Sequence, residues 1–373
     1  MGQGRRKRIL VVDDSAVMRS LLRSVLATDP TLEIAGTAQD GETALRLMET
    51  LKPDLVLMDV EMPVMDGLQT LRAMKGRNLR MPVIMCSALT QRGARVTIES
   101  LASGAADYVA KPSNQLGPAV ALENLAHDLL PKIHALTAKN NLVVLPLSQG
   151  LATGVAPGKP QAITAIPSIV VIGISTGGPA ALDVMLPMLP ANFPLPVLIV
   201  QHMPELFTNI LAERLKNRCR LKVHEAVDGE PVKAGFVYIA RGNWHLALAQ
   251  AQPIRNMPES CIRLTQAAQE NHCRPSVDVL FRSAAGIHGA GVLGVVMTGM
   301  GSDGLAGARL IRQNGGTVLA QDQASSAVWG MPGAVAQAGV AHKLLPLNSI
   351  AGEIIRLAGM GRKVEIKQGR LVV

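Results

Sequence analysis

Short apolar segments alternate with amphipathic segments along most of this chain, and this alternation limits the possible folds more than any other feature. In the first part, the continuously apolar runs are RILVVDD, LEIAGTA, DLVLMDV, MPVIMCS and AADYVAKP. The segments between them carry apolar residues three and four positions apart, which is typical of amphipathic helices. Apolar strands separated by helices form parallel sheets that are covered on both faces. The sequence therefore predicts an α/β fold that begins with a five-stranded parallel sheet.

A second strand–helix alternation begins at Ser168. The runs SIVVIGIS, PVLIVQHM, GFVYIA, GVLGVVMTG and GGTVLAQD predict a doubly wound, mainly parallel sheet. Residues 236–265 alternate between apolar and polar residues in the manner of an antiparallel hairpin.

Between the two alternations, a predicted helix at 116–138 is followed by a segment with linker composition at 139–167, rich in Gly, Pro, Ser, Thr and Ala. We therefore expect a first domain at 1–125, a terminal helix and flexible linker at 126–167, a second domain at 168–360 and a C-terminal tail at 361–373.

The composition favours a globular protein of a reducing compartment. Of the 373 residues, 48% are hydrophobic and 17% are charged, which argues against a largely disordered chain. The four cysteines form no CxxC pair, so neither a disulfide framework nor a zinc cage is indicated. Cys273 follows His272 but lacks further ligands at metal spacing, and we expect no metal site there. No apolar run has transmembrane length, so we expect a cytoplasmic protein without membrane insertion.

Positive charge is concentrated in the second part of the chain. Residues 1–125 hold 15 basic and 14 acidic residues, a balance of +1, so +8 of the total of +9 belongs to the remainder. A basic surface suits an acidic protein partner or nucleic acid. The sequence contains no helix-turn-helix spacing, zinc finger or aromatic RNA-binding motif, so we expect no nucleic-acid partner.

Polar side chains stand at the carboxyl ends of the predicted strands in the first domain. Asp13 and Asp14 end the first strand, Asp59 the third, Ser87 the fourth and Lys111 the fifth. A single aspartate there is commonly a helix cap, but ligands bind where such strand ends converge. Clustered carboxylates suit Mg²⁺, and one of them can be a nucleophile toward a phosphoryl group.

The segments VVDDSAVMR, LVLMDVEMPVMDG, CSA and YVAKP resemble the response-regulator receiver domain, which has a flavodoxin-like fold. The resemblance covers about 120 residues. It implies that Asp59 is the phosphoacceptor, that Asp13, Asp14 and Asp59 hold Mg²⁺, that Ser87 and Tyr108 are switch residues, and that Lys111 contacts the phosphate.

In the second domain, VVIGISTGGPAAL could be a phosphate loop, a structural turn or a strand end that presents a nucleophile. Ser175 ends one predicted strand, His202 ends another, and Asp303 lies just past a third. Alone, each has an ordinary interpretation as a helix cap, a core histidine or a turn residue. If the three strands are parallel neighbours, the residues can form the nucleophile, base and carboxylate of a serine hydrolase. Their order, Ser–His–Asp, differs from that of α/β-hydrolases despite the G-x-S-x-G string.

The segments GISTGGPAAL, QHMP, CRPSVDVLFRSAA, VMTGMGSDG and SSAVWGMPGAV resemble the protein-glutamate methylesterase of bacterial chemotaxis. The resemblance implies that Ser175 is the nucleophile, His202 the base and Asp303 its partner. Thr176, Gly177 and Met300 are candidates for the oxyanion environment, and CRPSVDVLF is expected to line or support the cleft. Arg241 departs from the family, which usually has proline at this position.

The two resemblances together imply a phosphorylation-activated serine hydrolase. Its substrates would be methylated glutamates, and also glutamines, on methyl-accepting chemotaxis receptors, and a chemotaxis histidine kinase would be the phosphodonor. Mg²⁺ would serve the receiver, and the esterase chemistry would need no cofactor. The alternatives are a DNA-binding response regulator and a non-catalytic nucleotide-binding module in which GISTGG cradles phosphate. The second alternative leaves His202 and Asp303 without a role.

Overall fold

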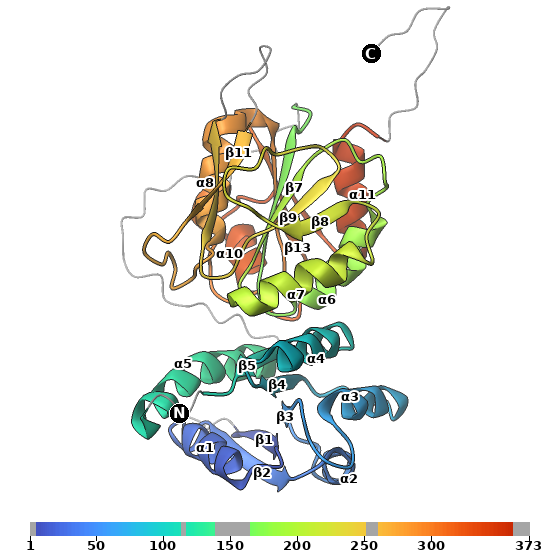
Figure 1. Ribbon diagram of the computed structural model, residues 1–373, viewed down its shortest axis with the longest axis vertical. Helices are drawn as coiled ribbons and strands as arrows, with labels where there is room; N and C mark the ends of the chain where they lie inside the picture. Colours follow the sequence, from blue (N-terminus) through green and yellow to red (C-terminus); the bar gives the residue numbers. More distant parts are fainter. Residues whose placement is uncertain (1–4, 113–116, 139–164, 251–259, 361–373) are drawn as a thin grey trace, which may run out of the picture. The chain divides into compact units, whose positions relative to one another are not determined.

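The computed structural model describes residues 5–112, 117–138, 165–250 and 260–360. These residues belong to two compact units, Met1–Ala156 and Pro157–Val373 (Figure 1). Most of the expected linker, residues 139–164, and the expected tail, residues 361–373, lie outside the described residues. None of the described helices is long and apolar enough to cross a membrane.

The first unit is a parallel sheet of five strands with helices between them, as the sequence predicts. The strand order is β2-β1-β3-β4-β5, and every pairing is parallel. In chain order the elements are β1 (Lys7–Val12), α1 (Ala16–Ala27), β2 (Leu32–Ala38), α2 (Gly41–Leu51), β3 (Leu55–Asp59), α3 (Gly67–Gly76), β4 (Val83–Ser87), α4 (Gln91–Ala102), β5 (Asp107–Ala110) and α5 (Pro118–Thr137).

Apolar residues of the strands and of two helices form a continuous core in this unit. Leu22 of α1 and Leu129 of α5 are fully buried in one cluster with Ile9 and Leu57 of the sheet. The N-terminus of α1 is capped by the hydroxyl of Ser15, which accepts a hydrogen bond from the backbone N–H of Met18. Because such a cap ends the preceding turn, the residues that follow β1 are held at the carboxyl edge of the sheet.

The second unit contains a sheet of seven parallel strands in the order β14-β13-β12-β6-β7-β9-β8. A separate antiparallel pair is formed by β10 and β11. In chain order the elements are β6 (Ile169–Ile174), α6 (Gly178–Met185), η1 (Leu186–Met188), β7 (Val197–Gln201), α7 (Glu205–Lys216), β8 (Lys222–Glu225), β9 (Phe236–Ile239), β10 (His245–Gln250), β11 (Ser260–Thr265), α8 (Val277–His288), η2 (Gly289–Gly291), β12 (Val292–Val296), α9 (Leu305–Gln313), β13 (Thr317–Gln321), α10 (Met331–Gln337), β14 (Lys343–Leu345) and α11 (Leu347–Leu357).

The predicted strands of this unit are confirmed, and the hairpin is smaller than expected. Within residues 236–265, β9 joins the parallel sheet, and only β10 and β11 pair in antiparallel fashion. The sequence analysis missed two strands, β8 and β14, because they are short and their side chains are partly exposed. Both lie at the edges of the sheet, where an apolar pattern is not required.

Each parallel sheet has a position where the chain changes the direction in which it adds strands. In the first sheet this position lies between β1 and β3, and in the second between β12 and β6. Ligands of open α/β sheets bind outside the carboxyl ends of the strands at such a switch point. The topology therefore identifies one edge in each unit where a functional site is expected.

Candidate functional sites

The carboxylate cluster of the first unit lies at its switch point. Asp13 follows β1, Asp59 ends β3, and both side chains are buried. Lys111, directly after β5, bridges them, with its Nζ 2.8 Å from Asp13 Oδ2 and 2.7 Å from Asp59 Oδ2. Asp14 is exposed beside them. The structure therefore brings together four of the residues that the sequence placed at strand ends.

Electrostatics at this cluster make Asp59 an unusually basic carboxylate. Burial, and the negative charge of Asp13, raise its pKa against the opposing effect of Lys111, to about 6. The ammonium of Lys111 is stabilised in turn, because its contacts with Asp13 and Asp59 outweigh burial and raise its pKa. A carboxylate with a raised pKa, held in place by a cation, is well prepared to act as a nucleophile.

The ligand set of this cluster fits Mg²⁺. Carboxylate oxygens of Asp13, Asp14 and Asp59 lie within 4.8 Å of one another. The Oδ2 atom of Asp13 is buried and contacts the ammonium of Lys111 at 2.8 Å, which leaves a lone pair of this oxygen for a metal ion. Hard oxygen ligands with unused acceptor capacity are what Mg²⁺ requires.

The two expected switch residues point into the protein. Ser87 is completely buried, and its Oγ lies 2.7 Å from Thr97 Oγ1 and 3.2 Å from the carbonyl oxygen of Ala88. Tyr108 is also buried, and its ring lies 5.3 Å from Lys132 Nζ. Both side chains are therefore shielded from solvent.

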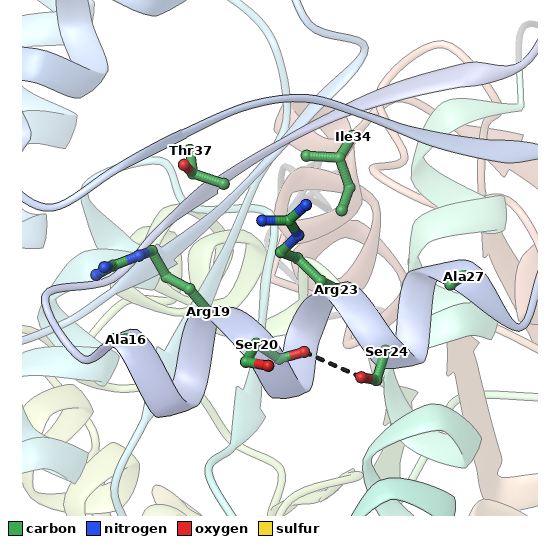
Figure 2. A pocket seen from close by; sticks show the side chains of 8 residues that line it. All are labelled: Ala16, Arg19, Ser20, Arg23, Ser24, Ala27, Ile34 and Thr37. Atoms are coloured by element: carbon green, nitrogen blue, oxygen red, sulfur yellow. Dashed lines mark hydrogen bonds between the residues drawn. The ribbon is translucent and has the colours of Figure 1, made fainter.

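Two hollows mark the surface of the first unit. One is lined by residues of the carboxylate cluster, including Asp14, Asp59 and Lys111. The other, shown in Figure 2, lies over α1 and β2 and is lined by Ala16, Arg19, Ser20, Arg23, Ser24, Ala27, Ile34 and Thr37. Its Arg19 donates hydrogen bonds to the carbonyl oxygens of Asp13 and Asp14. The lining of the second hollow has hydroxyl groups but no carboxylate, and its Arg19 supports the loop after β1 that carries Asp13 and Asp14.

The strands that carry Ser175, His202 and Asp303 are parallel neighbours, as a shared site requires. Ser175 directly follows β6 and His202 directly follows β7, and the last residues of these strands, Ile174 and Gln201, are register partners. The loop after β12, on the other side of β6, carries Asp303. In this loop, Asp303 Oδ2 lies 2.8 Å from His202 Nε2.

Asp303 is held as an ionised carboxylate by a dense set of donors. Apart from His202, the donors are Asn271 Nδ2, Ser276 Oγ and the backbone N–H groups of Val277, Asp278 and Gly304, at distances of 2.7–3.1 Å. The N–H groups of Val277 and Asp278 belong to the first turn of α8, where the helix dipole also favours negative charge. Burial alone would raise the pKa of Asp303, but the hydrogen bond from His202 and these other contacts lower it to about 2.

His202 is oriented by its two ring nitrogens. Nε2 is engaged by Asp303, while Nδ1 lies 3.6 Å from the thiol sulfur of Cys273. Burial lowers the pKa of His202, but the contacts with Asp303 and Cys273 outweigh it and raise the pKa to about 9. When the ring is neutral, the proton on Nε2 faces Asp303, and Nδ1 is the nitrogen that can accept a proton.

The turn after Ser175 depends on glycines. Gly177 has φ of +77°, and a Cβ there would lie 2.5 Å from that of Ala327. A Cβ on Gly299 would lie 2.8 Å from that of Ser175, so the chain just before Met300 passes directly beside the serine. Thr176 is buried, and Met300 is partly exposed. The residues expected in the oxyanion environment therefore flank Ser175 on two sides.

The sequence analysis missed several side chains of this site. It assigned CRPSVDVLF a general supporting role, and the structure shows that the Ser276 hydroxyl and the backbone N–H of Asp278 in this segment donate hydrogen bonds to Asp303. Asn271 bridges Asp303 and Asp278 through its amide nitrogen. Cys273 was expected to be unconnected to any ligand cluster, but it contacts His202, which is distant in sequence. No local spacing could have indicated these partners.

Arg241, the departure from the family pattern, ties its loop to α7. Its guanidinium makes an ion pair with Glu205, with Nε 3.0 Å from Oε1, and lies over the ring of Trp244 at 5.7 Å. Glu205 is the first residue of α7, which begins three residues after His202. The arginine therefore modifies a surface beside the site and contacts none of the three triad residues.

Comparisons with known proteins agree with both units. The family model described as response regulator receiver domain matches residues 9–117, and the model described as CheB methylesterase matches residues 170–354. The catalytic domain of the CheB methylesterase of Thermotoga maritima, a solved structure, is 46% identical with a TM-score of 0.49, and the match covers 51% of this chain and 98% of that one.

Relatives of full length are similar over nearly the whole chain. The protein-glutamate methylesterase/protein-glutamine glutaminase of Trichodesmium erythraeum is 46% identical over 353 residues, covering 94% of this chain and 99% of the relative. The protein of the same description in a Nocardioides species is 45% identical over 370 residues, which cover 98% of this chain and 99% of the relative. The chain therefore belongs to the protein-glutamate methylesterase/protein-glutamine glutaminase family, with a receiver domain ahead of a CheB methylesterase domain.

Proposed function

We propose that this protein hydrolyses the methyl esters of glutamate side chains, and the amides of glutamines, on methyl-accepting chemotaxis receptors in the cytoplasm. The observation that carries the proposal is the convergence of Ser175, His202 and Asp303 at the ends of neighbouring parallel strands, with His202 hydrogen-bonded to Asp303 at 2.8 Å. A nucleotide-binding module would need neither the histidine nor the buried carboxylate. The family membership supports the same choice of reaction.

In the proposed reaction, Ser175 is the nucleophile. His202 accepts its proton at Nδ1, because Nε2 is engaged by Asp303, and passes the proton to the departing methanol or ammonia. Asp303 stays ionised and stabilises the imidazolium form. Water then attacks the acyl-enzyme with His202 again as the base, which releases the glutamate carboxylate and restores Ser175.

The developing oxyanion is proposed to bind between the turn after Ser175 and the loop at Met300. Backbone N–H groups at Thr176, Gly177 and Met300 are the candidate donors, since these residues flank Ser175 on two sides. Preorganised backbone donors of this kind stabilise a tetrahedral intermediate without any change in protein conformation.

A direct test is the release of methanol from methylated receptor membranes. We expect Ser175→Ala to abolish it, because no other group of the triad can form the acyl-enzyme. Ser168→Ala is a matched control, since Ser168 lies at the opposite end of β6 and bonds His288. Full activity in the Ser175→Ala protein would refute the assignment. A gel-shift with duplex DNA tests the DNA-binding alternative, and we expect no shift.

The receiver is proposed to regulate this reaction through phosphorylation of Asp59 by a chemotaxis histidine kinase. Asp13, Asp14 and Asp59 would hold Mg²⁺, which neutralises charge on the phosphoryl group when bound. The new phosphoryl oxygens would attract Ser87 and Lys111, and Tyr108 would follow to a new position. We propose that the unphosphorylated receiver restricts access to Ser175. Removal of residues 1–139 should then raise the basal rate, and a truncated protein no faster than the full chain would contradict this.

A further inference from the structure

The thiol of Cys273 lies where a second metal ligand would lie beside His202. Its sulfur is 3.6 Å from His202 Nδ1. In a tetrahedral zinc site, with zinc–sulfur and zinc–nitrogen distances of about 2.3 Å and 2.0 Å, the sulfur and nitrogen are about 3.5 Å apart. The separation of the sulfur and the nitrogen therefore matches that of two ligands that share one zinc ion.

Asp303 completes an arrangement that is common around metal-binding histidines. A histidine that binds a metal through one nitrogen usually donates its other N–H to a carboxylate, which fixes the ring and its tautomer. Here Nε2 is held by Asp303 Oδ2 at 2.8 Å, so the lone pair of neutral His202 is on Nδ1, the nitrogen beside Cys273. Ligand atoms of all three residues lie within 4.8 Å of one another.

The pair is open to solvent and chemically distinct from the carboxylate cluster of the receiver. The His202 side chain is 14% exposed, and Cys273 is partly exposed, so an ion and its water ligands can reach them. Two protein ligands leave two positions of a tetrahedral ion for water or for another oxygen. Thiolate and imidazole favour Zn²⁺ or Cd²⁺, whereas the carboxylates of the receiver favour Mg²⁺.

We propose that His202 and Cys273 form a site for Zn²⁺ or a similarly thiophilic divalent cation, and that the bound ion inhibits the esterase. On binding, the Cys273 thiol releases its proton to solvent, and the ion takes the lone pair of His202 Nδ1. His202 then cannot accept the proton of Ser175, so acylation stops until the ion is removed. The inhibitory effect rests on the proposed function, whereas metal binding does not.

Binding is tested on the full-length protein with Co²⁺ as a spectroscopic probe, in excess Mg²⁺ that occupies the receiver. We expect a thiolate-to-cobalt charge-transfer band that Zn²⁺ displaces. Cys273→Ser should remove the band, and Cys219→Ser, which changes another partly exposed thiol, should retain it. The proposal is wrong if no band forms, or if the band survives in the Cys273→Ser protein.

Inhibition is tested by titrating Zn²⁺ into the unphosphorylated enzyme, with each variant normalised to its own metal-free rate. A Zn²⁺ concentration ten times the dissociation constant should leave about one tenth of the activity, and a chelator should restore it. Residues that only hydrogen-bond a metal ligand already contribute about 10–100-fold to metal affinity. Loss of the Cys273 ligand should therefore raise the Zn²⁺ concentration needed for half-inhibition by about 100-fold. Equal sensitivity of the Cys273→Ser and Cys219→Ser proteins would overturn the inhibitory role.

A measurement on the unaltered protein tests the site even if the Cys273→Ser variant does not fold. Zn²⁺ should slow the alkylation of Cys273 by iodoacetamide, followed by peptide mass spectrometry, and should leave the alkylation of Cys219 unchanged. Equal alkylation of Cys273 with and without Zn²⁺ would refute the site. A protein that binds Co²⁺ through Cys273 but releases no methanol would instead refute the proposed function and leave the metal site standing.

Discussion

Asp59 and Asp303 are both buried aspartates near the switch point of a parallel sheet, yet their pKa values move in opposite directions. The pKa of Asp59 is raised to about 6, and that of Asp303 is lowered to about 2. Burial raises both values, so burial does not explain the difference. Asp59 faces a second carboxylate, Asp13, and both share the ammonium of Lys111. Asp303 faces an imidazole and the N-terminus of α8.

The comparison shows how one fold prepares the same side chain for two tasks. A carboxylate that must attack phosphorus gains from a like charge beside it, because the raised pKa makes its oxygens more basic and therefore more nucleophilic. A carboxylate that must only hold a histidine gains from many donors, because these keep it ionised and fixed. The neighbours of each aspartate, rather than its depth in the protein, decide its chemistry.

The largest expected effect comes from removing the charge at Asp303. Asp303→Asn should lower kcat by about 10³–10⁴-fold, because the amide cannot stabilise the imidazolium or fix its tautomer. The measurement is methanol release, with thermal melting as the check that the variant folds. A loss of less than about tenfold in a folded variant would mean that Asp303 is only a helix cap, and the comparison with Asp59 would lose its functional meaning.

The second largest expected effect is a difference in pH dependence between the two sites. Methanol release requires neutral His202, so with a pKa of about 9 the rate should rise about 50-fold from pH 7 to pH 9. In the metal-free receiver, the ionised fraction of Asp59 should fall about tenfold from pH 7 to pH 5, which NMR titration of its carboxyl carbon measures. The Ser175→Ala protein supplies the background for spontaneous ester hydrolysis. Coincident midpoints for the two pH profiles would break the comparison.

A smaller effect is expected at Asn271, which bonds both Asp303 and Asp278. Asn271→Ala should lower kcat about tenfold with little change in KM, because it loosens Asp303 without touching the substrate. A rise in KM at constant kcat would instead assign Asn271 to substrate binding. Asn314→Ala is a suitable control, since that asparagine bonds only the backbone of its own helix among the described residues.

The smallest effect concerns the stability of the receiver. The folded-state pKa of Asp59 lies above its usual value of 3.8, so its contribution to stability is present below pH 3.8 and is lost as the pH rises through about 6. Asp59→Asn removes the repulsion from Asp13 and should stabilise the receiver by about 1 kcal/mol at pH 7. Urea unfolding at pH 7 measures this. A destabilised variant would show that the Lys111 contact outweighs the repulsion.

Much of the fold follows from the sequence alone, because apolar runs locate strands, and polar residues at the strand ends locate candidate sites. The positions of Ser175, His202 and Asp303 at the ends of neighbouring strands were predicted in this way, and the hydrogen bond between His202 and Asp303 agrees with that placement. Cys273 and Asn271 were not, because their partners His202 and Asp303 are distant in the chain and are brought near only by tertiary packing. The edge strands β8 and β14 were missed because partly exposed strands do not need continuous apolar runs.

The strand order also determines when each site can come into existence during protein synthesis. The receiver is complete once α5 has left the ribosome. In the second unit, β6 can pair with β7 soon after both are synthesised. Its other edge can pair only after β12 has been synthesised, and His202 can bond Asp303 only after the loop that follows β12 has been synthesised. Because domains generally fold as they emerge, the regulatory unit is folded before the catalytic unit can act. In a nascent chain, the receiver can therefore fold before Ser175, His202 and Asp303 come together.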